Sequence, residues 1–172
     1  MADRWTPAEL DARRRVVVFA HRPEQALQIL SFRPLAAGED PGNSLCASCV
    51  YWAERGDWFL TSVDVMALLE GSLAAPMRFC VDEKNQLREI LVSFQPVAVK
   101  CSDPDTETFF RFIMAFPDLK PRNTEREVKV FRWSVLERML QSIIGGCVRL
   151  RGNTPRFQKM AGHGLCVDGN LN

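Results

Sequence analysis

Apolar positions near the start of the chain form short runs separated by breaks of glycine, proline and polar residues. The β-branched run at residues 16–19 predicts a strand, and a second strand is expected over residues 27–32. Proline within residues 21–24 predicts a turn between them. Residues 34–44 combine glycine, proline and acidic side chains and predict a loop. The pattern therefore predicts a pair of strands followed by a loop.

Three further apolar segments have the length and residue types of strands. Residues 49–52 and 58–60 predict a hairpin, joined by a glycine-containing turn at residues 54–57. Residues 97–100 predict another strand after a proline. Residues 128–131 alternate apolar and charged side chains, which is typical of a half-buried strand.

Polar residues with helix-capping spacing precede several helical patterns. Thr6 with Glu9, Thr61 with Asp64, and Ser134 with Glu137 each place a hydroxyl three residues before a carboxylate. The first pair predicts a short N-terminal helix, the second a helix up to about residue 72, and the third a helix over 135–144 that ends at two glycines. Two more helices are expected over residues 82–93 and from residue 103 to about residue 114.

This order of elements predicts an α+β fold, with a mostly antiparallel sheet and three to five packed helices. We expect residues 1–14 to form an N-terminal helix and a basic lead-in, and residues 15–147 to form the globular domain. Residues 148–172 have many glycine, asparagine and arginine residues without periodicity, and predict a flexible tail.

The net charge of +1 on 172 residues does not demand a polyanionic partner, but the charge is unevenly distributed. Residues 1–100 hold 11 Lys and Arg against 13 Asp and Glu, whereas residues 119–160 hold 10 against 3. Positive charge therefore concentrates late in the chain. The chain shows no secretory signal and no run of 18 apolar residues, so neither a membrane span nor disulfides are expected.

No constellation of residues predicts an enzyme, a metal site or a cofactor. Cys46 and Cys49 have half of a zinc-site spacing, but no second pair of ligands follows. His21 and His163 are the two histidines, and neither belongs to a nucleophile–base pattern. No small-molecule substrate is expected.

The basic segment at residues 120–132 is the main candidate for a binding surface. Lysine and arginine neutralise phosphates, and arginine and asparagine also pair with base edges. The alternative is a solvated loop whose charge is compensated by neighbouring glutamates. The DNA-binding candidates in this segment are Lys120, Arg122, Asn123, Arg126, Lys129 and Arg132.

The triple arginine Arg13, Arg14 and Arg15 is a second candidate for DNA contact. Its alternative is the polar lead-in to a strand.

Four stretches of the chain resemble the Medusa family of fungal developmental regulators. They begin at Arg13 (RRRVVVFAHRPEQALQILSFRPL), Ser48 (SCVYWAERGDWFLTSVDVMALLEGS), Arg78 (RFCVDEKNQLREILVSFQPVAV) and Thr108 (TFFRFIMAFPDLKPRNTEREVKVFRWSVLERML). The most specific phrase is FPDLKPRNTEREVKVFRW. A fainter similarity, to WOPR-type DNA-binding domains, rests on WFLTSVDVMALLE followed by VDEKNQLR and assigns no individual contacts.

The Medusa resemblance implies a nuclear, non-enzymatic regulator of transcription in conidiation and related development. DNA and other transcription regulators are then the expected partners. An alternative within the same setting is a protein–protein interaction module without direct DNA contact.

Overall fold

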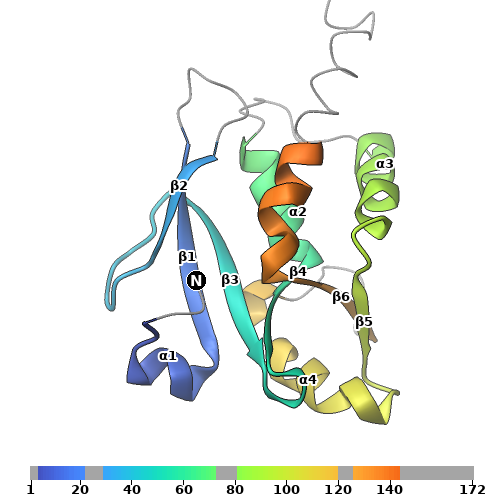
Figure 1. Ribbon diagram of the computed structural model, residues 1–172, viewed down its shortest axis with the longest axis horizontal. Coiled ribbons are helices and arrows are strands. Elements are labelled where there is room, and N and C mark those ends of the chain that lie inside the picture. Colours follow the sequence, from blue (N-terminus) through green and yellow to red (C-terminus); the bar gives the residue numbers. More distant parts are fainter. Residues whose placement is uncertain (1–3, 22–28, 73–80, 120–125, 144–172) are drawn as a thin grey trace, which may run out of the picture.

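The computed structural model describes residues 4–21, 29–72, 81–119 and 126–143, and within them six strands form one antiparallel sheet (Figure 1). The order across the sheet is β2-β1-β3-β4-β6-β5. The strands are β1 (Arg14–His21), β2 (Ile29–Pro34), β3 (Leu45–Trp52), β4 (Asp57–Thr61), β5 (Val97–Lys100) and β6 (Glu127–Arg132).

Helices pack on the sheet and at its ends. They are α1 (Pro7–Ala12), α2 (Ser62–Ser72), α3 (Val81–Val92), α4 (Pro104–Met114) and a helix over residues 136–143, with short 3-10 turns at Ala53–Arg55, Pro117–Leu119 and Trp133–Val135. The predicted α+β class, with an antiparallel sheet and three to five helices, is confirmed.

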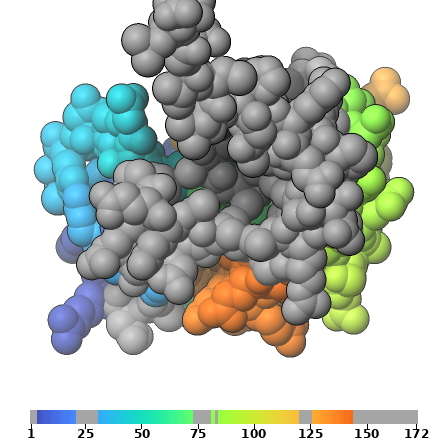
Figure 2. All heavy atoms as spheres, turned by 90° about the horizontal axis from the view of Figure 1, so that it is seen from above, coloured from blue at the N-terminus to red at the C-terminus, as the bar shows by residue number. Residues whose placement is uncertain are grey.

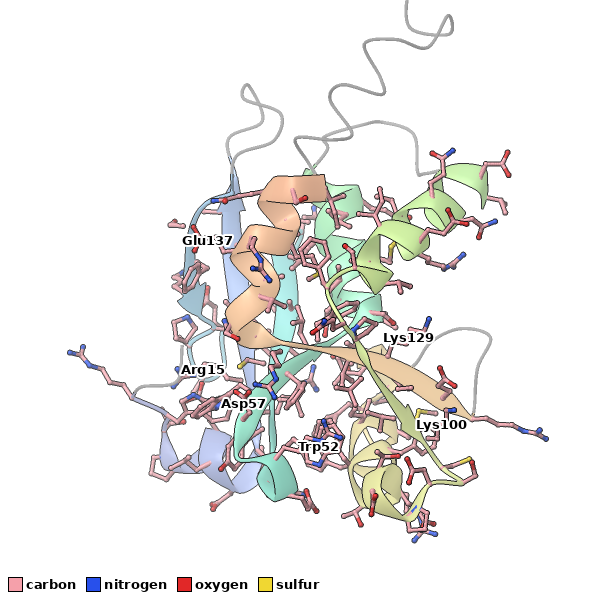
Figure 3. The ribbon with its side chains drawn as sticks, turned by 45° about the vertical axis from the view of Figure 1, so that its right-hand side comes forward. Arg15, Trp52, Asp57, Lys100, Lys129 and Glu137 are labelled. Atoms are coloured by element: carbon pink, nitrogen blue, oxygen red, sulfur yellow. The ribbon has the colours of Figure 1, made fainter. Side chains whose placement is uncertain are left out.

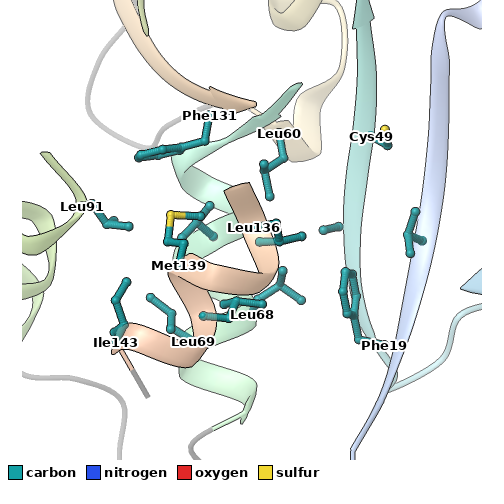
Figure 4. Close-up of a cluster of buried hydrophobic side chains, with 14 of the residues drawn as sticks. Phe19, Cys49, Leu60, Leu68, Leu69, Leu91, Phe131, Leu136, Met139 and Ile143 are labelled. Atoms are coloured by element: carbon teal, nitrogen blue, oxygen red, sulfur yellow. The ribbon is translucent and has the colours of Figure 1, made fainter. Parts of the chain in front are cut away.

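Side chains alternate between the two faces of the sheet, and each face has its own core. On the first face, Val17, Leu60 and Phe131 are buried together with the apolar stripes of α2 and the helix over residues 136–143 (Figure 4). Leu87 and Leu91 of α3 complete this core.

The second face is covered by α4 and the turn that follows it. Trp52 stacks on Phe109 with ring centroids 4.2 Å apart, and Phe59 meets the same ring edge-on at 6.2 Å. Ile113 and Leu119 are fully buried against these rings and the strand valines. The two cores explain why β3, β4 and β6, at the centre of the sheet, are apolar on both sides.

The predicted cap at Thr61 and Asp64 forms where β4 ends and α2 begins. The Asp64 N–H donates to Thr61 Oγ1 at 3.2 Å, and the Thr61 hydroxyl donates to Asp64 Oδ2 at 3.2 Å. Burial raises the pKa of Asp64 to about 7, while hydrogen bonds from the Ser48 backbone and Thr61 act in the opposite direction. Asp64 thus links the start of α2 to the middle of β3.

Most predicted elements are confirmed, with two differences. β2 lies two residues later than expected, at Ile29–Pro34. The predicted capping box at Ser134 and Glu137 is wrong, because Ser134 lies inside the 3-10 turn Trp133–Val135, whose N-cap is Arg132. The Glu137 carboxylate instead accepts a hydrogen bond from Gln141 at 3.2 Å.

Three other expectations concern parts of the chain outside the described residues. They are the turn between β1 and β2 beyond His21, the helix stop at Gly145 and Gly146, and the tail over residues 148–172.

Candidate nucleic-acid interface

Strand β6 carries two of the predicted DNA-binding residues, and they lie on opposite faces of the sheet. Lys129 is exposed on the same face as Phe131. Arg132 alternates with Phe131 and so lies on the opposite face. Arg126 is exposed just before the strand begins.

The neighbouring strand β5 adds a cation that the sequence did not single out. Lys100 pairs across the sheet with Glu127, and its ammonium lies 3.6 Å from that carboxylate. Lys129 lies opposite Ala98, on the same face as Lys100, because paired residues and every second residue share a face (Figure 3). The small alanine side chain leaves the Lys129 ammonium open to solvent.

Arg126 lies beside the same end of β5. Its carbonyl accepts a hydrogen bond from the Cys101 N–H at 3.2 Å, one residue beyond the pairing of Lys100 with Glu127. We call Lys100, Arg126 and Lys129 the basic edge. Its three cations outnumber the one neighbouring carboxylate, that of Glu127, so its net charge is positive.

Arg132 is engaged elsewhere. Its guanidinium lies 3.5 Å from Asp57 Oδ2, across the start of β4. This ion pair is largely exposed, and its contribution to stability is small for that reason. Arg132 therefore lies apart from the basic edge, and Asp57 partly neutralises its charge.

The first two residues of the triple arginine hold α1 and β1 against α4. Arg13 adopts a left-handed backbone conformation, with φ at 48°, that ends α1, and its guanidinium lies 4.1 Å from the centre of the Phe112 ring. Arg14 donates from Nε to the Ser48 hydroxyl at 3.0 Å and forms an ion pair with Asp118. Both side chains thus fasten the sheet to the second-face helix.

Arg15 is buried, with 3% of its surface exposed. Its guanidinium donates to both Glu9 oxygens, at 2.7 and 2.9 Å, and to the Arg4 carbonyl at 2.6 Å. It also lies 4.9 Å from the centre of the Trp5 ring. The hydrogen bond from Arg15 is the main cause that lowers the pKa of Glu9 to about 2.

The structure does not bring the triple arginine and the basic edge together. Strand β1 is separated from β6 by β3 and β4, and Arg15 and Lys129 lie on opposite sides of the molecule (Figure 3). The contacts of Arg13, Arg14 and Arg15 favour a structural role over contact with DNA.

Lys120, Arg122 and Asn123 lie outside the described residues. They precede Arg126 in the chain, and their part in a DNA-binding surface stays a prediction.

The cysteines of the half zinc-site spacing point to opposite faces of β3, because an odd separation along a strand changes the face. Burial raises the pKa of the Cys49 thiol to about 12, which disfavours the reactive thiolate. Over residues 4–21, 29–72, 81–119 and 126–143, no three His, Cys, Asp or Glu side chains are grouped to hold a metal ion.

These features define a small α+β domain, with helices on both faces of an antiparallel sheet and a positively charged edge at β5 and β6. A family model described as "Domain of unknown function (DUF7082)" matches residues 1–144, and the chain belongs to this family. No curated protein and no solved structure matches the chain. In the described part of the chain, no helix is long and apolar enough to cross a membrane.

Proposed function

We propose that this domain belongs to a transcription regulator of the Medusa type and contacts DNA through the basic edge. The observation that carries the proposal is the exposure of Lys100 and Lys129 on one face at the sheet edge, with Arg126 beside them. Two cations on adjacent strands, with a third just before β6, offer a phosphate backbone several contacts at one edge of the sheet. The sequence resemblance supplies the regulatory setting and the expected location in the nucleus.

The basic edge suits backbone contact better than base recognition. A rigid strand pair positions its lysines at fixed separations, and lysine acts as a point charge toward phosphate. Arg126 is the one member whose guanidinium forms the bidentate contacts that distinguish guanine. Lys120, Arg122 and Asn123, which precede Arg126 in the chain, remain predicted DNA contacts.

The proposal includes no catalytic step. The Cys49 thiol is buried and its pKa is raised, which leaves it poorly suited as a nucleophile. The Asp103 carboxylate caps α4 by accepting from the Asp105 N–H at 3.1 Å. These reactive side chains thus have structural roles that account for their positions.

A protein–protein interaction module is the second candidate. It is favoured by the interleaving of cations and carboxylates along β4, β5 and β6, where Arg132 meets Asp57 and Lys100 meets Glu127. A mixed-charge surface complements a folded partner, for example another transcription regulator, better than it complements a uniform polyanion.

Fluorescence anisotropy with a labelled random duplex tests the proposal through the double variant Lys100→Gln, Lys129→Gln. We expect its affinity to fall by at least about tenfold for every duplex tested, because phosphate contacts are independent of sequence. The matched control is Arg111→Gln, which removes a cation that is 77% exposed on α4. It should bind like the wild type. Equal affinity of the folded double variant and the wild type would reject the basic edge, and an absence of DNA binding would favour the interaction module.

A further inference from the structure

Strand β2 ends the sheet, and it exposes an aromatic side chain there. Phe32 is 54% exposed, although its ring contacts the buried Phe19 at a centroid distance of 6.1 Å. The Phe19 ring in turn lies 6.4 Å from Trp133. A row of three aromatic rings thus runs across the first face and stops at the outer edge of β2, which pairs with no further strand in the described part of the chain. This edge lies on the opposite side of the molecule from α3 (Figures 1 and 2).

The pattern of hydrogen bonds between β1 and β2 shows which backbone groups of β2 point away from the sheet. The Leu35 N–H donates to the Val16 carbonyl at 2.9 Å, next to the pairing of Val17 with Pro34. In an antiparallel ladder, bonded and non-bonded pairs alternate. Because Leu35 is hydrogen-bonded to Val16, the next pair is non-bonded, the pair after it is bonded, and the pair of Phe19 with Phe32 is again non-bonded. The Phe32 N–H and C=O therefore point away from β1.

Two features confine this outward-facing backbone to a short segment. Pro34 has no N–H, and a register shift between Ala20 and His21 interrupts the pairing of β1 with β2 on the other side of Phe32. Phe32 lies between these two interruptions. A partner strand is thus restricted to a short ladder centred on this residue.

We propose that β2 pairs with β2 of a second copy of this chain, antiparallel and with Phe32 opposite Phe32. This register is self-complementary, because the Phe32 N–H of each copy meets the Phe32 carbonyl of the other. It places Ser31 opposite Arg33, so the two Arg33 side chains are not directly opposed. Each Arg33 is also neutralised by an ion pair with Glu39 of its own chain.

The second copy also continues the aromatic row. The Phe32 rings of the two copies share a face as a cross-strand pair, which covers apolar surface that one copy leaves exposed. A foreign strand would gain the same two backbone hydrogen bonds but would need its own aromatic side chain at this position. The ladder is short, so the dimer is weak and depends on concentration.

Sedimentation velocity of the full chain, from about 5 µM to about 500 µM, measures this association. We expect the weight-average sedimentation coefficient of the wild type to rise with concentration. Phe32→Glu and Phe32→Lys should each remain monomeric, because like charges then face each other across the two-fold axis. An equimolar mixture of the two variants should regain association, because opposite charges then meet.

The matched control is Leu10→Ser, which removes an apolar side chain that is 59% exposed on α1. It should associate like the wild type. Phe32→Pro removes both the outward N–H and the aromatic ring and should also abolish association, while circular dichroism checks that the fold is kept. A wild type that stays monomeric throughout, or variants at Phe32 that associate like the wild type, would overturn the proposal. Failure of the mixture to associate would overturn the register.

Discussion

Arg15 and Glu9 form an ion pair that joins the first helix to the first strand, with Arg15 Nε 2.7 Å from Glu9 Oε1. Glu9 also closes the capping box of α1, since the Thr6 N–H donates to its carboxylate at 2.7 Å. One carboxylate therefore caps a helix and compensates a buried guanidinium.

Glu9→Gln should destabilise the domain by about 2 kcal/mol, because it leaves the charge of Arg15 buried without a counter-ion. Chemical denaturation at neutral pH measures this loss, with the exposed Glu137→Gln as the control. The pKa of Glu9 is lowered from 4.5 to about 2, so its stabilising contribution is complete above pH 4.5. It is lost as the pH falls toward 2. The difference between wild type and variant should shrink over this range, and a constant difference would contradict the account.

Asp64→Asn should have the opposite pH signature. The pKa of Asp64 is raised from 3.8 to about 7, so the unfolded chain releases this proton at a lower pH than the folded domain. The wild type therefore loses stability relative to the variant as the pH rises from about 4 to 7, by at most about 1.4 kcal/mol per pH unit. Below pH 4 the difference is constant. Denaturation midpoints across this range test it, with Asp105→Asn as an exposed control. If the stability of Asp64→Asn and of the wild type changed with pH in parallel, the raised pKa of the buried Asp64 carboxyl would be contradicted.

Phe109→Ala should be among the most damaging single changes on the second face. The ring stacks on Trp52 at 4.2 Å and is almost fully buried, so its removal leaves a cavity. Such truncations cost about 3–5 kcal/mol. Thermal or denaturant unfolding gives the value, and Leu10→Ala, at an exposed position, should change stability by less than about 0.5 kcal/mol. A loss below about 1 kcal/mol for Phe109→Ala would show that α4 does not cover this face.

Local signals made most of the fold predictable from the sequence. The caps at Thr6 and Thr61 depend on residues three positions apart, and both form as expected. Ser134 has the same spacing but lies in a 3-10 turn, because this turn follows β6 at once and the extended N-cap residue is Arg132. Spacing alone does not distinguish these two situations.

The candidate site was less predictable, because it depends on contacts between distant segments. Lys100 joins the basic edge only through the register of β5 with β6. Arg15 is unavailable for contact with DNA because α1 folds back onto β1 and Glu9 forms an ion pair with it. Neither relationship has a signal within a short window of sequence.

The salt dependence of DNA binding by the wild-type chain tests the central proposal most directly. Direct contact by the three cations of the basic edge predicts that log K falls linearly with log salt, with a slope of about −2.7 or steeper. Binding that is undetectable at low salt, or that is insensitive to salt, would contradict DNA contact through the basic edge.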